Sequence, residues 1–192
     1  IHRVTFKPYP VCAFNQTPVT AALELRERIG GRAVKSARVR MNPYETGYAG
    51  MDSKGPFSTV GGTLMSIPFC IALTLLKGDP TMQAMTTYDD AAVNALVDRI
   101  DLIPDEGVAR LCCIIEVELE DGSSEAIDKR VTTEDFNFSR AGVSALVRRI
   151  GREERVPEEA YDRIERFAET LPDADLGLVL SAFALCPSSR RS

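Results

Sequence analysis

The chain has 192 residues, of which 44% are hydrophobic and 27% charged, a balance typical of soluble globular proteins. This length accommodates one domain with its own hydrophobic core. The net charge of −5 and the pI of about 5.1 argue against a broad basic surface. We therefore expect neither nucleic acid nor a membrane as a partner.

The cysteine and histidine content indicates a reduced protein without a metal site. The five cysteines show no spacing typical of a disulfide framework, which favours the cytoplasm as the location. His2 is the single histidine and no Cys-x-x-Cys pair occurs, so no metal site is expected. The chain opens at Ile1 without a methionine, and we expect it to be a fragment of a longer protein.

The first half of the chain predicts two strands and two helices. Thr17 followed by Pro18 is typical of a helix N-cap and first helical position. Because a helix joins the first two strands, they are candidates for a parallel crossover. The predicted strands cover residues 2–7 and 33–40, and the predicted helices cover 18–29 and 64–76.

The second helix lies in an uncharged segment, residues 55–76, that has to be distinguished from a membrane span. Its dense apolar part begins only at Leu64 and contains Pro68. Crossing a bilayer takes roughly 20 consecutive apolar residues. The segment is therefore predicted to form a buried helix.

The second half predicts a helix, a hairpin and a helical end. The helix begins at Asp89 or Asp90, with an apolar stripe that reaches Ile100. A strand over 111–120 turns at Asp121-Gly122 into a return strand over 126–131, and Lys129 and Arg130 are expected near the glutamates of the first strand. Three further apolar stripes predict helices over residues 143–150, 160–171 and 176–183.

Together these elements predict an α+β fold with a mixed or antiparallel sheet and helices packed on one face. We expect residues 1–192 to form a single domain of this kind.

The segment from Lys7 to Thr17 is the first candidate site, because it joins a strand end to a helix start. Free amide groups and the positive end of the helix dipole suit a carboxylate. Lys7 adds a full positive charge, Gln16 a side-chain donor, and Cys12 lies close in the sequence. The residues alone favour the simpler alternative, a proline-braced loop with a capping Thr17 and a buried Cys12.

A second candidate is the loop over residues 44–58, which is rich in glycine and contains Tyr44 and Tyr48. Such loops can close over ligands, although a flexible surface loop is the commoner case. Ser66 has no Gly-x-Ser-x-Gly context and no histidine that would complete a triad, so its hydroxyl is expected to bond the backbone.

Several motifs occur in the order found in the MmgE/PrpD family. The chain contains Lys7-Pro-Tyr-Pro, then Gln16-Thr17-Pro18-Val19-x-Ala21-Ala22-Leu23, and Met65-Ser66-Ile67-Pro68-Phe69 in an apolar helix. Asp52 and Gly55-Pro56-Phe57, Tyr88-Asp89-Asp90 and Glu120-Asp121-Gly122 complete the series. Up to about residue 140 the chain therefore resembles the second, C-terminal α+β domain of this family.

The resemblance implies a cofactor-independent lyase or isomerase that acts on a small di- or tricarboxylate. Family members include 2-methylcitrate dehydratase, cis-aconitate decarboxylase and iminodisuccinate epimerase, which remove or deliver a proton next to a carboxylate. It also implies partners: a helical N-terminal domain that is missing here or supplied by another chain, and a homodimer in the full-length form. Activity is expected only when that helical domain is present.

The resemblance implies catalytic roles for Lys7 and Cys12 and substrate-binding roles for Gln16, Thr17 and Ser66. Cys12 and Gln16 stand where some members carry histidine. A thiolate at Cys12, stabilised by Lys7 and the helix start, is one candidate base; a shaping role is the other. The missing imidazoles also favour a second hypothesis, a non-catalytic binding or assembly module with residues 55–76 as an apolar interface.

Overall fold

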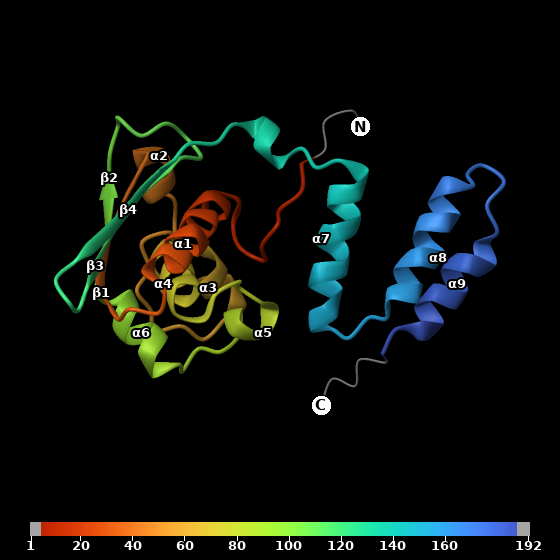
Figure 1. Ribbon diagram of the computed structural model, residues 1–192, viewed down its shortest axis with the longest axis horizontal. Helices are drawn as coiled ribbons and strands as arrows, with labels where there is room; N and C mark the ends of the chain where they lie inside the picture. The colour runs from red at the N-terminus through yellow and green to blue at the C-terminus, as the bar shows by residue number, and fades with distance from the viewer. Residues whose placement is uncertain (1–4, 188–192) are drawn as a thin grey trace. The chain divides into compact units, whose positions relative to one another are not determined.

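The computed structural model describes residues 5–187 (Figure 1). The chain divides into two compact units, Ile1–Asn137 and Phe138–Ser192, and the single domain over residues 1–192 stays a prediction. The first unit contains a sheet and a layer of helices, and the second contains three helices. This arrangement confirms the α+β fold class.

The sheet of the first unit has four strands in the order β2-β1-β3-β4. β1 pairs in parallel with β2 and antiparallel with β3, and β3 pairs antiparallel with β4. The sheet is therefore mixed, as predicted. The strands are β1 (Val34–Met41), β2 (Ile100–Pro104), β3 (Cys113–Leu119) and β4 (Ser124–Lys129).

Helices cover one face of this sheet (Figure 1). α1 contacts β3 and β4, α4 contacts α1 and β2, and α6 contacts β1. Alternate strand residues such as Val39, Ile115 and Val117 are fully buried beneath them. The helices and 3-10 turns of this unit are η1 (Ala13–Asn15), α1 (Gln16–Ile29), α2 (Pro43–Thr46), α3 (Val60–Met65), α4 (Ile67–Lys77), α5 (Met82–Met85), α6 (Ala91–Val97) and η2 (Thr133–Phe136).

The parallel partner of β1 differs from the prediction. Residues 5–7 form no strand, and residues 1–4 lie outside the described part of the chain. β2 takes that place, with Ile100 opposite Ala37. Sequence assigned Ile100 to the preceding helix, but α6 ends at Val97. The apolar spacing of α6 continues to Ile100 because Ile100, as the first residue of β2, is buried as well.

The apolar helix predicted over residues 64–76 is two helices, α3 and α4, separated by Ser66. Ser66 has an extended backbone (φ −65°, ψ 116°) and ends one helix while it caps the next. α4 is buried from Ile67 to Leu75, so this helix offers no surface for the interface that the assembly hypothesis placed here. Among the described residues, no helix is long and apolar enough to cross a membrane.

The open face of the sheet carries ion pairs, as the alternating glutamates of β3 predict. Glu116 lies 3.1 Å from both Arg38 and Arg40 of β1. The expected partners Lys129 and Arg130 do not face these glutamates. In the β3–β4 register Lys129 stands opposite Cys113, and its ammonium bonds Glu24 of α1 at 2.5 Å.

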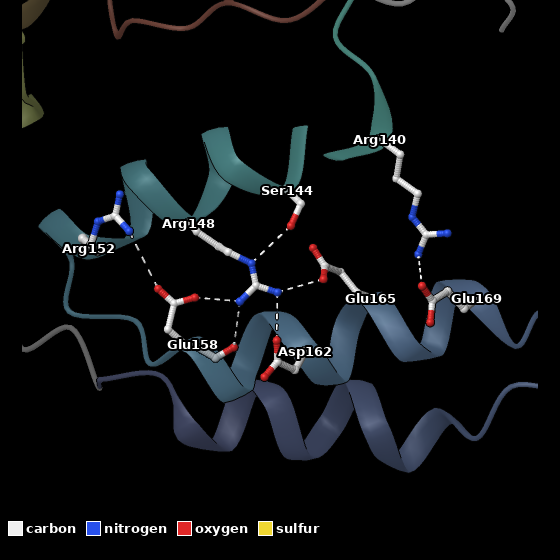
Figure 2. Close-up of polar contacts among 8 residues, drawn as sticks. All are labelled: Arg140, Ser144, Arg148, Arg152, Glu158, Asp162, Glu165 and Glu169. Atoms are coloured by element: carbon white, nitrogen blue, oxygen red, sulfur yellow. Dashed lines mark hydrogen bonds and ion pairs between the residues drawn. The ribbon is translucent and has the colours of Figure 1, made fainter. Parts of the chain in front are cut away.

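The second unit consists of α7 (Arg140–Glu153), α8 (Glu158–Glu169) and α9 (Leu176–Leu185). Arg148 joins α7 to α8, because its guanidinium contacts Glu158, Asp162 and Glu165 at 2.6–2.9 Å (Figure 2). α9 packs along α8 and leaves large apolar side chains exposed. These are Leu176, Leu180 and Phe183.

Candidate anion site beside Lys7

The loop before α1 is closed by the side chain of Gln16, which is 2% exposed. Its Oε1 accepts a hydrogen bond from the backbone N–H of Tyr9 at 3.1 Å. Its Nε2 donates to the carbonyls of Tyr9 and Val11, both at 3.0 Å. The amide is thus engaged with the chain's own backbone and serves to hold the loop against the helix start. Substrate binding by Gln16 stays a prediction.

Lys7 lies at the other end of this loop and its side chain is exposed. Its Nζ donates to the carbonyl of Val11 at 3.3 Å, the same oxygen that accepts from Gln16. The Lys7 ammonium and the Gln16 amide therefore meet at one carbonyl, that of Val11, while the backbone N–H of Gln16 at the start of α1 donates to the carbonyl of Ala13.

A cavity of about 140 Å³ opens beside this pair. Most of its walls are apolar, and within the described chain Lys7 is the one charged residue that lines it. The lining residues are Thr5, Phe6, Lys7, Ala13, Gln16, Leu111, Thr133 and Phe136. The structure thus brings Lys7 and the beginning of α1 to one cavity, an arrangement suited to the carboxylate of a small organic acid.

Thr17 lies inside the helix, and its predicted role as the N-cap is wrong. α1 begins at Gln16, because a 3-10 turn over Ala13–Asn15 leads directly into it. The N-cap residue Asn15 makes no capping bond, since its Nδ2 donates to the carbonyls of Leu64 and Met65. Thr17 is buried and does not line the cavity, and its contact with substrate remains a prediction.

Cys12 is partly buried and turned toward the helices. Its N–H donates to the carbonyl of Leu64 at 3.0 Å, and the Cys70 thiol lies near the same oxygen, at 3.9 Å. Burial, and to a lesser extent the nearby Cys12, raises the pKa of the Cys70 thiol. Cys12 does not line the cavity beside Lys7. The geometry favours the shaping role over the thiolate base.

Ser66 is fully buried and uses its hydroxyl for the local fold. Its Oγ donates to the carbonyl of Ser53 at 2.5 Å and accepts from the N–H of Phe69 at 3.0 Å. These are the backbone bonds that its sequence context predicts. Ser66 does not line the cavity, and its substrate-binding role stays untested.

The loop over residues 44–58 carries an aromatic cluster. The Phe14 ring makes edge contacts with Tyr44 and Tyr48, with ring centroids 5.9 and 5.7 Å apart. The Arg110 guanidinium lies over the Tyr44 ring at 4.0 Å. Phe14 and Arg110 are the sequence neighbours of two residues of the cavity wall, Ala13 and Leu111.

Sequence reasoning missed Glu45, a fully buried acid in α2. Its Oε1 accepts from the backbone N–H of Leu111 at 2.6 Å, whereas its Oε2 has no partner. Burial raises the pKa of this carboxyl, and the Leu111 bond and the charge of Arg110 oppose the shift. Asn42-x-x-Glu45 has the spacing of a capping box, which signals a helix start but not a partner 66 residues away.

In the described part of the chain, no three His, Cys, Asp or Glu side chains gather in a way that could hold a metal ion. The chemistry that the cavity offers is that of a cation and a helix start beside apolar walls. This defines a small α+β domain with a candidate site for an organic anion.

Comparison with known protein families agrees with this class. The family model of the MmgE/PrpD C-terminal domain matches residues 9–169. The chain therefore belongs to the MmgE/PrpD family as a C-terminal domain. The match includes the loop over residues 9–16, all four strands, and α7 and α8. A search of curated proteins gives no significant match.

Proposed function

We propose that this chain is the smaller domain of a lyase or isomerase that acts on a small di- or tricarboxylate such as 2-methylcitrate. The reaction would remove or deliver a proton next to a carboxylate. Family membership supports the class of enzyme. The observation that carries the proposal is the cavity shared by Lys7 and the first turn of α1.

Lys7 would hold a carboxylate of the substrate and the negative charge that grows when the adjacent proton leaves. Fixed positive groups lower the barrier most when they face the developing charge in a site that excludes water. Phe6, Leu111 and Phe136 contribute apolar walls beside this position. Because the Lys7 side chain is exposed in this chain, the exclusion of water that strengthens charge interactions would come from the helical domain or a partner chain.

The base that takes the proton would come from outside this chain. Lys7 is the one titratable group among the described residues that line the cavity, and its proposed role is already to hold the carboxylate. We therefore propose that turnover requires the helical N-terminal domain or a partner chain. The homodimer, the cytoplasmic location and the independence from cofactors remain predictions from the resemblance.

Acetylation of Lys7 with and without tricarballylate, a citrate analogue, tests this proposal. Site occupancy measured by mass spectrometry is expected to show that the anion slows acetylation of Lys7 at least fivefold. Lys35, an exposed lysine on the open face of the sheet, serves as the matched control and should be unaffected. Equal acetylation of Lys7 with and without the anion would contradict the assignment.

Lys7→Ala in the enzyme that includes the helical domain supplies the second test. Loss of the ammonium is expected to reduce turnover at least a hundredfold, because removal of one stabilising group at a reacting centre costs roughly 10²–10³ in rate. Lys7→Arg keeps the charge and should retain more activity than Lys7→Ala. Normal turnover in Lys7→Ala would overturn the role of Lys7.

An assembly module is the second candidate function, and the exposed face of α9 favours it. Leu176, Leu180 and Phe183 are each more than 60% exposed and follow one another at helical spacing. Light scattering of the wild-type chain and of Leu180→Lys tests this alternative. It predicts association that the lysine abolishes, whereas a monodisperse monomer in both cases counts against it.

A further inference from the structure

The carboxyl group of Glu45 is buried and makes one hydrogen bond, to the backbone N–H of Leu111. The side chain has 0% exposure, and one of its two carboxyl oxygens has no partner. Burial of a carboxyl without full hydrogen bonding is unfavourable. An apolar residue at this position would avoid the free-energy penalty of burying a carboxyl. The bond from Leu111 to Glu45 therefore points to a specific role for the acid.

That bond holds a strained residue. Leu111, whose N–H donates to Glu45 at 2.6 Å, has a φ of 63°, in the left-handed region that disfavours branched side chains. Residues in such conformations persist when their surroundings hold them, and they cluster at functional sites. Arg110, the residue before, is fixed at the same time by its contact with the Tyr44 ring, next to Glu45.

Leu111 is also part of the wall of the cavity beside Lys7. It lines the same cavity as Lys7, Ala13 and Gln16. Glu45 is not among the described residues that line this cavity, and its bond to Leu111 is the side-chain hydrogen bond that links it to the wall. The contact spans 66 residues of sequence and fixes one wall relative to α2.

We propose that Glu45 is a positioning residue that clamps Leu111 in its left-handed conformation and so sets the wall of the anion cavity beside Lys7. This inference rests on the proposed function, because it assigns Glu45 a part in the fit of the organic acid. Glu45 fixes the shape that the acid meets, and Lys7 supplies the charge.

Four variants of the full 192-residue chain test the clamp. Glu45→Ala removes the acceptor, and Glu45→Gln keeps an acceptor oxygen of the same reach. Leu111→Gly places at φ 63° the residue that tolerates it. Glu106→Ala, in the exposed turn before Leu111, is the matched control for loss of a carboxylate.

Hydrogen exchange of the Leu111 amide, measured by NMR, reports the clamp without any ligand. We expect exchange at least tenfold faster in Glu45→Ala, near the wild-type rate in Glu45→Gln, and unchanged in Glu106→Ala. Unchanged exchange in Glu45→Ala overturns the clamp. If Glu45→Ala does not fold, the same comparison is made in Glu45→Ala/Leu111→Gly, whose relieved strain is expected to restore folding while the amide still exchanges fast.

The concentration of tricarballylate that gives half-maximal protection of Lys7 from acetylation then measures how well the cavity binds the anion. A rise of at least tenfold in Glu45→Ala, with less than a threefold change in Glu45→Gln, is expected. If tricarballylate protects Lys7 equally well in the wild type and in Glu45→Ala, the positioning role of Glu45 is overturned. The assignment of Lys7 to the anion site then still holds. Absence of protection in the wild type overturns the proposed function, while the exchange experiment still decides the clamp.

Discussion

The carboxamide of Gln16 pairs with the peptide of Tyr9, accepting from its N–H at 3.1 Å and donating to its carbonyl at 3.0 Å. The pair closes the loop that carries Lys7's hydrogen-bond acceptor, Val11. A buried side chain thereby bonds both backbone groups of Tyr9.

Gln16→Ala is expected to destabilise the chain by about 2–3 kcal/mol, because it removes the hydrogen bonds of a buried amide to the backbone of Tyr9 and Val11. Urea unfolding followed by circular dichroism measures this change. Gln83→Ala, at the other glutamine of the chain, is the control and should change the stability by less than about 0.5 kcal/mol, since Gln83 is exposed. A loss equal to that of the control would show that the loop holds without the amide.

Gly151→Ala is expected to disrupt the contact between α7 and α8. A Cβ at this position would lie 1.4 Å from the Tyr161 hydroxyl and 2.6 Å from its ring, far inside van der Waals contact. Overpacking of this kind costs roughly 1–3 kcal/mol or more, and thermal unfolding measures it. Gly142→Ala in the same helix meets nothing closer than 3.3 Å and is the control. Restoration of stability by Gly151→Ala/Tyr161→Ala is expected.

Arg148→Ala should destabilise the second unit more than Arg140→Ala does. Arg148 is 18% exposed and bonds three carboxylates of α8, whereas Arg140 is exposed and bonds only Glu169 among the ion pairs of the described chain (Figure 2). We expect a loss of about 1 kcal/mol for Arg148→Ala and less than about 0.5 kcal/mol for Arg140→Ala. Denaturant unfolding at low and high salt checks both, and a salt-independent loss would contradict an electrostatic origin.

Glu45 predicts a pH dependence of stability with a definite sign. Because burial raises the pKa of its carboxyl in the folded chain above the ordinary value, the unfolded state ionises first as the pH rises. The stability of the wild type relative to Glu45→Gln is therefore greatest below the unfolded pKa and falls as the pH rises through the folded pKa. Unfolding of both chains across the acid range measures it; an opposite slope would show that the bond to Leu111 outweighs burial.

Cysteine labelling is expected to distinguish two groups of thiols. Cys12 and Cys186 are partly exposed, whereas Cys70, Cys112 and Cys113 are buried, and burial raises the pKa of Cys70 and Cys113. N-ethylmaleimide should modify the first two at least tenfold faster, as measured by mass spectrometry. Since Cys12 does not line the cavity beside Lys7, tricarballylate is expected to leave its labelling rate unchanged.

Sequence alone determined the elements whose signals are local. The alternating residues of β3 and the apolar stripe of α1 repeat with the period of their own backbone, and burial matches those periods. The stripe over residues 160–171 predicted the helix α8, but of its members only Ala160 is buried, and Ile164 and Leu171 are exposed. The α+β class followed from their order. Lys7 beside the start of α1 was also accessible from sequence, because both lie at the ends of one short loop.

Only the tertiary structure decided which distant segments meet. The parallel partner of β1 is β2, whereas residues 5–7 of the strand predicted for that place form no strand, because pairing depends on backbone edges that no local pattern identifies. Glu116 faces Arg38 rather than Lys129 because strand register sets the partner. The bond between Glu45 and Leu111 likewise depends on the tertiary structure. The two residues are 66 positions apart, and no local sequence pattern indicates that they lie close together in space.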